Sequence, residues 1–230
     1  FSNTGQVCVG IERAYVVGDV YEEFVAELLH QVSRLRLGVG YDWDVDVGSL
    51  ASAQQLEAVS AHVSDAVAKG AFVLAGGRPR PDVGPFCYEP TVLAGVTEEM
   101  AVCREETFGP VLSLYRVASE DEAVERANDS RYGLNASVWS AGRGEAVAAR
   151  LRVGTVNVNE GYAAAWGSHA ASMGGMGESG MGRRHGGHGL LKYTEPQTVA
   201  VQRLHPIAPP RGMGNKGYAD VMTRAIGLLN

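Results

Sequence analysis

The sequence has little cysteine, few aromatic residues and no long apolar run. Its 230 residues include 3 cysteines and 7% aromatic residues. Cys8, Cys87 and Cys103 are odd in number and form no C-x-x-C pair, which argues against a disulfide framework or a zinc site and favours reduced thiols in the cytoplasm. His185 and His188 lack acidic or cysteine neighbours, so no metal site is expected there either. No stretch approaches the roughly 18 apolar residues of a membrane span.

Positive charge is also scarce. Lys and Arg number 20 against 26 Asp and Glu, which gives a formal net charge of −6. The one local basic cluster, residues 183–185, is too short for a surface that tracks phosphates, so neither nucleic acid nor a membrane is an expected partner. Residues 1–17 lack the segments of a signal peptide. Because the sequence begins with Phe1, we expect a processed chain or a fragment whose start lies upstream.

Glycine, in contrast, is abundant. The chain has 30 glycines, about 13% of its residues, against a usual share of about 7%, and eight lie between Gly174 and Gly189. Gly175-x-Gly177-x-x-Gly180 matches the dinucleotide-binding fingerprint as a string of letters. No strand pattern precedes it, however, and residues 182–189 are too rich in glycine to sustain a helix. We therefore expect a loop whose backbone passes close to another element.

Strand and helix patterns alternate along residues 11–159. β-Branched and alternating segments predict strands at 11–17, 71–75, 110–117, 135–140 and 155–159. Helical patterns follow residue 19 and cover 52–70, 119–127 and 145–152. This alternation predicts an α/β fold with an open, mostly parallel sheet flanked by helices. Further along, a strand is predicted at 193–202, at a sheet edge because it contains Pro196, and an amphipathic helix at about 218–229.

Polar residues mark the starts of the predicted helices. Ser52 with Gln55, and Ser119 with Glu122, have the spacing of capping boxes, and Asp19 is expected to cap the first helix. Apolar residues of that first helix recur at helical spacing and are expected to be buried. They are Val20, Phe24, Leu28, Val32 and Leu35.

Cys8 is the first candidate for chemistry. It lies in Gly5-Gln6-Val7-Cys8-Val9-Gly10, just before the first predicted strand. A cysteine is more often a small core residue than a nucleophile. The flanking glycines, however, predict a tight loop that exposes the sulfur and frees backbone N–H groups, which a thiolate and an oxyanion need. Both interpretations stay open on these residues alone, and Cys87 and Cys103 are expected to be structural.

The segment Glu105-Glu106-Thr107-Phe108-Gly109-Pro110 is the second candidate. It can be a solvated turn with Phe108 folded into the core. Alternatively, a carboxylate faces sugar hydroxyls and the aromatic ring lies beside a flat cofactor. Taken alone, the segment favours the solvated turn.

Together, three ordered motifs resemble the aldehyde dehydrogenase superfamily. They are Phe1-x-Asn3-x-Gly5-Gln6-x-Cys8, then Glu105-Glu106-x-Phe108-Gly109-Pro110, then the glycine-rich segment with Gly186 and Tyr193-Thr194-Glu195. The resemblance covers essentially the whole chain. Residues 157–186 are most similar to succinate-semialdehyde dehydrogenases of actinobacterial type.

The resemblance implies a division of the chain. It predicts a catalytic α/β domain over 1–160, a glycine-rich loop over 161–190, an oligomerisation strand over 191–204, and a linker with an amphipathic helix over 205–230. A homodimer or homotetramer would form through the strand near Tyr193 to Val201. The family's nucleotide-binding domain, its general-base glutamate and its asparagine oxyanion donor lie upstream of the cysteine motif and are absent from this sequence.

The resemblance also implies roles for site residues. Cys8 would attack the aldehyde, the thiohemiacetal would pass a hydride to NAD or NADP, and water would hydrolyse the thioester to the acid. The Cys8 N–H would form part of the oxyanion hole. Glu106 would hold the nicotinamide-side ribose, with Phe108 beside it and Gln55 as a second ribose contact. The expected substrate contacts are Val7, Val9, Asn159 and Met173.

Three positions depart from the family pattern. Ala58 and Gly177 stand where lysine is usual, and Arg184 stands where an acid is usual, which puts a proton-relay role there in doubt. Three hypotheses remain. The chain is the catalytic and assembly half of an NAD(P)-dependent aldehyde dehydrogenase, with succinate semialdehyde as the expected substrate and no activity as a fragment. It is a non-catalytic interaction module, or it is an acylating relative that passes its thioester to a thiol carrier.

Overall fold

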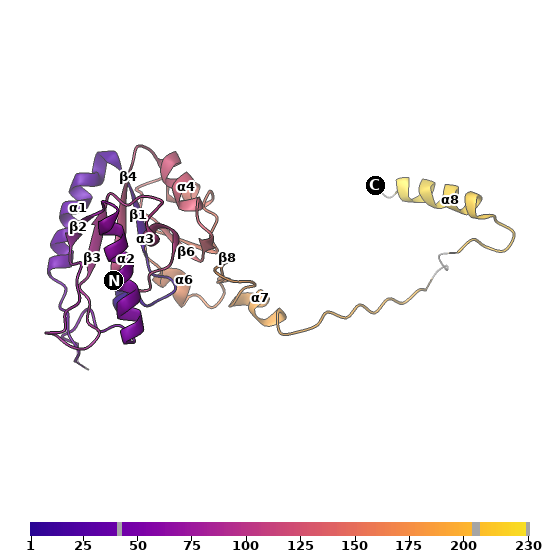
Figure 1. Ribbon diagram of the computed structural model, residues 1–230. Coiled ribbons are helices and arrows are strands. Elements are labelled where there is room, and N and C mark those ends of the chain that lie inside the picture. Colours follow the sequence, from indigo (N-terminus) through magenta and orange to yellow (C-terminus); the bar gives the residue numbers. More distant parts are fainter. Residues whose placement is uncertain (41–42, 204–207, 229–230) are drawn as a thin grey trace. The chain divides into compact units, whose positions relative to one another are not determined.

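The computed structural model describes residues 1–40, 43–203 and 208–228 (Figure 1). The chain divides into two units, Phe1–Tyr193 and Thr194–Asn230, which are described separately. The strands are β1 (Arg13–Val17), β2 (Phe72–Ala75), β3 (Thr91–Ala94), β4 (Val111–Val117), β5 (Tyr132–Gly133), β6 (Asn135–Val138), β7 (Thr155–Val158) and β8 (Met176–Gly177). The helices are η1 (Ser2–Gly5), α1 (Gly18–Ser33), α2 (Ala53–Ala68), α3 (Ala101–Arg104), α4 (Glu120–Asn128), α5 (Gly144–Ala148), α6 (Ala163–Gly167), α7 (Gly186–Leu191) and α8 (Asn215–Gly227).

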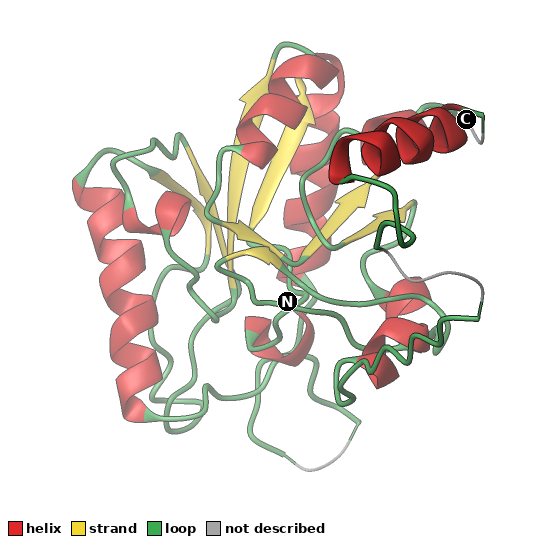
Figure 2. Cartoon of the chain, turned by 90° about the vertical axis from the view of Figure 1, so that its right-hand side faces the viewer, coloured by secondary structure: helices red, strands yellow, loops and turns green. Residues whose placement is uncertain are grey.

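Four strands form the main sheet of the first unit, in the order β1-β4-β3-β2. Both β1 and β3 pair with β4 in parallel, with Arg13 opposite Ser113 and Thr91 opposite Val111. Only β2 is antiparallel to its neighbour. Helices lie on either side of these strands (Figure 2). The predicted α/β fold with a mostly parallel sheet flanked by helices is therefore confirmed.

The strand β3 has no counterpart in the sequence-based prediction. It has four residues, and Val92 and Leu93 are both fully buried. A short strand buried on both faces shows no alternation of polar and apolar residues. Its position between β2 and β4 nevertheless makes it part of the main core, where Leu93 belongs to the same buried cluster as Val59 and Val63 of α2.

Two further strand pairs lie beyond β4. β6 and β7 are parallel, with Asn135 opposite Thr155, and both fall inside predicted strands. β5 and β8 are antiparallel, with Gly133 opposite Met176. This second pair connects the glycine-rich segment to the end of the loop that follows α4.

Two predictions about helix α1, its cap and its buried residues, differ from the structure. Its N-cap is Val17, and Asp19 lies within the first turn instead. None of its residues is buried, and Val20 and Phe24 are more than one third exposed. Tyr21 is half-buried, and the exposed guanidinium of Arg116 on β4 lies 5.3 Å from the centre of its ring. The partly buried face of the helix consists of Gly18, Tyr21, Val25, Leu28, Leu29 and Val32.

The glycine-rich segment is less irregular than expected. Residues 186–191 form α7, although they were expected not to sustain a helix. Each glycine costs a helix only about 1 kcal/mol relative to alanine, which local contacts can offset over so short a length. The expected close approach of backbone is confirmed, because a Cβ at Gly154 would lie 1.5 Å from the Gly174 oxygen and one at Gly177 would lie 2.3 Å from the Arg131 oxygen.

In the second unit, residues 194–203 are exposed and form neither helix nor strand. The strand predicted at 193–202 is therefore not formed, because an edge strand needs a neighbour to complete its ladder and none pairs with it among the described residues. The predicted C-terminal helix is confirmed as α8, which begins at Asn215 rather than Tyr218. Its predicted end, Leu229, and the boundary between 204 and 205 lie outside the described residues. Across the part of the chain that the structure covers, no helix has the length and apolar character to span a bilayer.

Candidate active site

Cys8 lies on an exposed turn just before β1. The Gly10 N–H closes this turn by donating to the Val7 carbonyl oxygen at 2.9 Å, and the Cys8 thiol is free and exposed. No acceptor for the Cys8 N–H lies among the described residues. The predicted tight loop with an exposed sulfur is confirmed. Cys87, in contrast, is buried, and burial raises the pKa of its thiol, as expected for a structural cysteine.

The residues before Cys8 are anchored from the side of α2. Thr4 and Gly5 adopt left-handed backbone conformations, with φ of 59° and 72°. Thr4 Oγ1 accepts a hydrogen bond from the Gly48 N–H at 3.1 Å, and Gln6 Oε1 accepts one from the Ala51 N–H at 2.8 Å. These bonds attach the segment that carries Cys8 to the chain that leads into α2.

The same segment touches the second predicted motif. A Cβ at Gly5 would lie 1.9 Å from the carbonyl oxygen of Gly109, far inside contact distance. Gly109 in turn has no room for a side chain, because its Cβ would lie 2.4 Å from a methyl carbon of Val59. The loop of Cys8 and the loop of Glu106 are thus in direct backbone contact.

Within the second motif, Glu106 and Phe108 differ in environment. The Glu106 residue is exposed and Phe108 is partly buried. Although the residue is exposed, partial desolvation of its carboxyl group raises the pKa of Glu106, and the positive charge of Arg131 opposes that shift. Phe108 has a φ of 46°, a conformation that costs a non-glycine residue free energy. The solvated-turn interpretation is thus correct for Glu105 and Glu106, which are exposed, while Phe108 is only partly buried.

Gln55 is one of the residues that hold this loop. Its backbone N–H donates to Ser52 Oγ at 3.2 Å, which confirms Ser52 as the cap of α2. The Gln55 side chain, however, does not return to Ser52 as a capping box would require. Its Nε2 donates to the carbonyl oxygens of Thr107 and Phe108, both at 2.9 Å. Gln55 therefore lies against the loop that carries Glu106 and Phe108 and binds its backbone through the amide nitrogen.

Three further polar residues around this loop were not predicted. The Glu12 carboxylate accepts hydrogen bonds from the N–H groups of Thr107 and Phe108, and His62 Nδ1 lies 3.1 Å from Thr107 Oγ1. Arg131 forms ion pairs with Glu105 and Glu178. Of these three residues, only His62 had a signal in its spacing, because it follows Gln55 by about two turns on the same helix and therefore lies on the same face.

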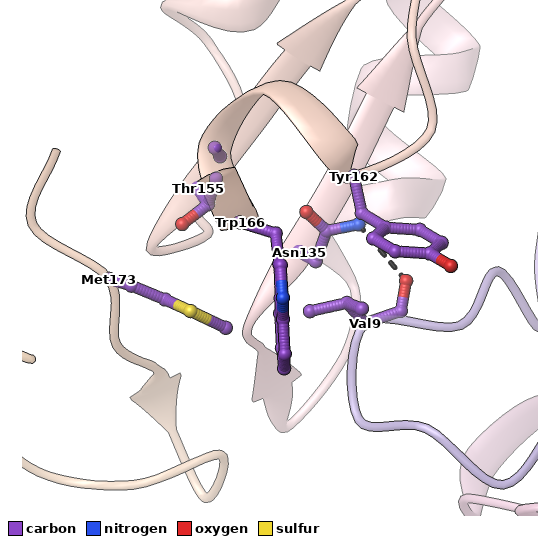
Figure 3. Close-up of a pocket in the computed structure, with 7 residues that line it drawn as sticks. Val9, Asn135, Thr155, Tyr162, Trp166 and Met173 are labelled. Carbon is purple, nitrogen blue, oxygen red and sulfur yellow. Dashed lines mark hydrogen bonds between the residues drawn. The ribbon is translucent and has the colours of Figure 1, made fainter. Parts of the chain in front are cut away.

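A small pocket, too tightly filled to admit a water molecule, lies beside the Cys8 turn (Figure 3). The Trp166 ring stands between the side chains of Val9 and Met173, and Val9 and Met173 are both buried. The Asn135 amide reaches the Val9 carbonyl oxygen at 3.2 Å. The remaining lining residues are Thr155, Tyr162 and Ala165. The structure thus brings together two of the four predicted substrate residues.

The other two predicted substrate residues lie apart from this pocket. Val7 is partly buried in the turn that Gly10 closes. Asn159 follows β7 directly, and its amide accepts from the Ser140 N–H at 2.9 Å and donates to the Ser140 oxygen at 3.0 Å. Its side chain is therefore bonded to the backbone just after β6. Among the described residues, no group of three or more His, Cys, Asp or Glu side chains could hold a metal ion.

The α/β fold brings together two of the three motifs by which the sequence resembles aldehyde dehydrogenases, the exposed cysteine turn and the loop of Glu106. Residues 1–199 match the model of the aldehyde dehydrogenase family. The chain belongs to this family.

Individual relatives have names that are more specific than the family. The chain is 60% identical over 215 residues to a Mycobacterium tuberculosis protein named "putative succinate-semialdehyde dehydrogenase NADP(+) 2", covering 93% of this chain and 42% of that protein. It is 57% identical over 228 residues to a Mycolicibacterium smegmatis protein named in the same way, covering 98% of this chain and 44% of that protein. A crystal structure of succinate-semialdehyde dehydrogenase from Burkholderia pseudomallei superimposes with a TM-score of 0.75 at 37% identity, covering 84% of this chain and 39% of that one. The chain therefore spans less than half the length of these relatives.

Proposed function

We propose that this chain supplies the nucleophile and the nicotinamide-facing loop of an aldehyde dehydrogenase that oxidises succinate semialdehyde to succinate. One observation carries the proposal: the exposed Cys8 turn is in backbone contact, through Gly5 and Gly109, with the loop of Glu106. The hydride must pass to the cofactor from the substrate carbon that is bound to the Cys8 sulfur. The nucleophile and the carboxylate that binds the cofactor must therefore lie on adjacent segments.

In the proposed reaction, the Cys8 thiolate adds to the aldehyde carbonyl and forms a carbon–sulfur bond. The unpaired Cys8 N–H donates to the oxyanion of the thiohemiacetal. A bound nicotinamide cofactor supplies the acceptor for the hydride that leaves this carbon. Water then adds to the thioester on Cys8, which releases the carboxylic acid and restores the thiol.

The residues of the second loop fit the sugar end of such a cofactor. Glu106 presents an exposed carboxylate for ribose hydroxyls, and Phe108 offers an aromatic ring that is partly exposed. Gln55 would meet the ribose only through Oε1, because its Nε2 is bonded to the loop. The names of the mycobacterial relatives favour NADP over NAD.

The same names favour succinate semialdehyde as the substrate. Val7, Val9 and Met173 would contact its chain near Cys8, with Asn159 further from the pocket at the end of β7. In Figure 3 Trp166 stands between Val9 and Met173, so the substrate would have to displace this side chain. The three free cysteines and the need for a reduced nucleophile favour the cytoplasm as the location.

A second proposal concerns assembly. We propose that residues 193–201 pair with another copy as an edge strand, giving a homodimer or homotetramer. Val199 and Val201 are 78% and 68% exposed, and a partner strand would both cover them and complete the backbone ladder. This observation also favours the interaction-module alternative, in which pairing is the whole function.

The test compares this chain with a longer protein that places the N-terminal part of the Mycobacterium tuberculosis relative before Phe1. NADPH formation from succinate semialdehyde is measured for both. We expect activity from the longer protein only, and Cys8→Ala should reduce it by at least about a thousandfold. Cys103→Ala is the matched control and should leave most of the activity. Activity that survives Cys8→Ala would refute the nucleophile, and an inactive longer protein that still self-associates would favour the interaction module.

A further inference from the structure

The Glu12 carboxylate accepts hydrogen bonds that have no role in the proposed reaction. Glu12 Oε1 accepts hydrogen bonds from the N–H groups of Thr107 at 3.1 Å and Phe108 at 2.9 Å. Glu12 Oε2 accepts a second bond from the Thr107 N–H at 2.9 Å. One carboxylate thus binds two successive backbone amides of the loop that carries Glu106 and Phe108.

These hydrogen bonds compensate the carboxylate of Glu12 for its partial removal from water. Burial raises the pKa of Glu12 and the nearby Glu106 raises it further, while the two backbone hydrogen bonds and, to a smaller extent, the positive charge of Arg13 lower it. No side chain among the described residues forms an ion pair with Glu12 at 4.0 Å or less. Glu12 is half-buried, and a carboxylate that is partly removed from water must be paired or hydrogen-bonded, so the loop amides are its direct hydrogen-bond partners.

Glu12 is also fixed with respect to the nucleophile. It lies four residues after Cys8, directly before β1, and its carbonyl oxygen accepts from the Ser113 N–H of β4 at 2.9 Å. Gln55 and His62 hold the same loop, but both project from α2 and bind carbonyl oxygens and a hydroxyl. Glu12 alone of the three projects from the segment that carries Cys8.

The loop needs such support because Phe108 has a φ of 46°. A non-glycine residue keeps a left-handed conformation only where its surroundings hold it there. The N–H of Phe108 is one of the two that Glu12 binds, so the support acts on the strained residue itself.

We propose that Glu12 is a positioning residue that sets the distance and orientation of the Glu106–Phe108 loop relative to Cys8. Its effect on the reaction rests on the proposed function, whereas its effect on the loop does not. Without the carboxylate, the amides of Thr107 and Phe108 lose their acceptor and the loop samples other conformations. The cofactor then binds less tightly, while the Cys8 turn, which has its own anchors at Gly48 and Ala51, keeps its reactivity.

The first experiment measures hydrogen exchange of the amides of residues 107 and 108 in this chain. Glu12→Ala should accelerate their exchange by about tenfold or more, since bonds to a charged acceptor are lost. Glu12→Gln keeps one acceptor oxygen and should give an intermediate rate. The control is Glu23→Ala, at an exposed position of α1, which should leave exchange unchanged. Equal exchange in all variants would overturn the proposal whatever the enzyme does.

The second experiment uses the longer protein. Glu12→Ala should raise the KM for NADP by about tenfold or more, with a smaller change in kcat and with alkylation of Cys8 by iodoacetamide within about twofold of the unaltered protein. Glu12→Gln should restore part of the KM. An unchanged KM, or a loss of Cys8 alkylation equal to the change in KM, would overturn the positioning role. If the unaltered longer protein has no activity, the proposed function fails, while the exchange experiment still decides the role of Glu12.

Discussion

Single glycines decide how closely the two loops of the candidate site approach. At Gly5 two requirements coincide, because its φ is 72° and a Cβ would collide with the Gly109 carbonyl group. At Gly70 only the first applies, because its φ is 100° but nothing lies within 4 Å of the added atom. At Gly142 neither applies. The three positions therefore separate backbone conformation from close contact.

Gly5→Ala should destabilise the first unit most. A left-handed alanine costs about 1–2 kcal/mol, which Gly70→Ala should also show, and overpacking against Gly109 should add about 1–3 kcal/mol. Gly142→Ala should change stability by less than about 0.5 kcal/mol. Urea unfolding of the three variants measures the differences. If Gly5→Ala and Gly70→Ala lower the free energy of unfolding equally, the close contact with Gly109 does not contribute to the cost of Gly5→Ala.

The ion pair of Arg36 and Asp46 gives a test that depends on pH. Arg36 Nε lies 2.9 Å from Asp46 Oδ2, and hydrogen bonds from the Arg36 side chain and backbone lower the pKa of Asp46 to about 2. A carboxyl whose pKa is lower in the folded protein stabilises it above its ordinary pKa of about 4, and this contribution is lost as the pH falls through about 2.

Arg36→Gln should therefore move the pKa of Asp46 back toward its ordinary value, as measured by NMR titration of the carboxyl carbon. Arg34→Gln, an exposed neighbour, is the control and should leave the titration of Asp46 unchanged. If Asp46 titrates at the same pH with and without Arg36, the ion pair is not formed in solution.

At the scale of elements, helix caps were predictable where a short polar side chain could reach the backbone. Ser52 and Ser119 accept hydrogen bonds from the N–H groups of Gln55 and Glu122, as their spacing predicts. Asp19 was not the cap of α1, because β1 runs directly into the helix at Val17. Caps depend on a few neighbouring residues, so the sequence contains most of the information that they need.

Ser52→Ala should destabilise the first unit by about 1 kcal/mol, because one N–H at the start of α2 loses its acceptor. Chemical denaturation measures the change. Ser64→Ala lies at an exposed position in the middle of the same helix and should be neutral or slightly stabilising, since alanine has the higher helix propensity. A cost at Ser64 as large as that at Ser52 would contradict the capping role.

At the scale of the whole molecule, the first unit has a closed core while residues 194–203 are exposed along their entire length. The segment was predicted as a strand from its own residues, yet a strand exists only with a partner. Its exposed apolar residues are what the proposed assembly through residues 193–201 would cover.

Val199→Asp should weaken this assembly, because it places a charge where an apolar side chain would be buried. Sedimentation velocity of the longer protein should show a shift toward smaller species. Thr198→Asp is the matched control, since it adds the same charge on the opposite face of an extended chain, and its effect should be smaller. An unshifted profile for Val199→Asp would contradict pairing through this segment.

The sequence by itself determined the fold class, most helices, the exposed cysteine turn and the family. Each of these depends on the order of residues along the chain or on spacings of a few residues, as in Gly5-Gln6-Val7-Cys8 or Ser52 with Gln55. Only the tertiary structure decided that β3 lies inside the main sheet, that Gln55 binds the Thr107 and Phe108 carbonyls, and that Glu12 binds their amides. These contacts join residues that are 52 to 96 positions apart, and no local pattern encodes which distant backbone group a side chain will meet. The physical reason is that packing of the sheet and helices brings the two loops together, and the hydrogen bonds form only once they meet.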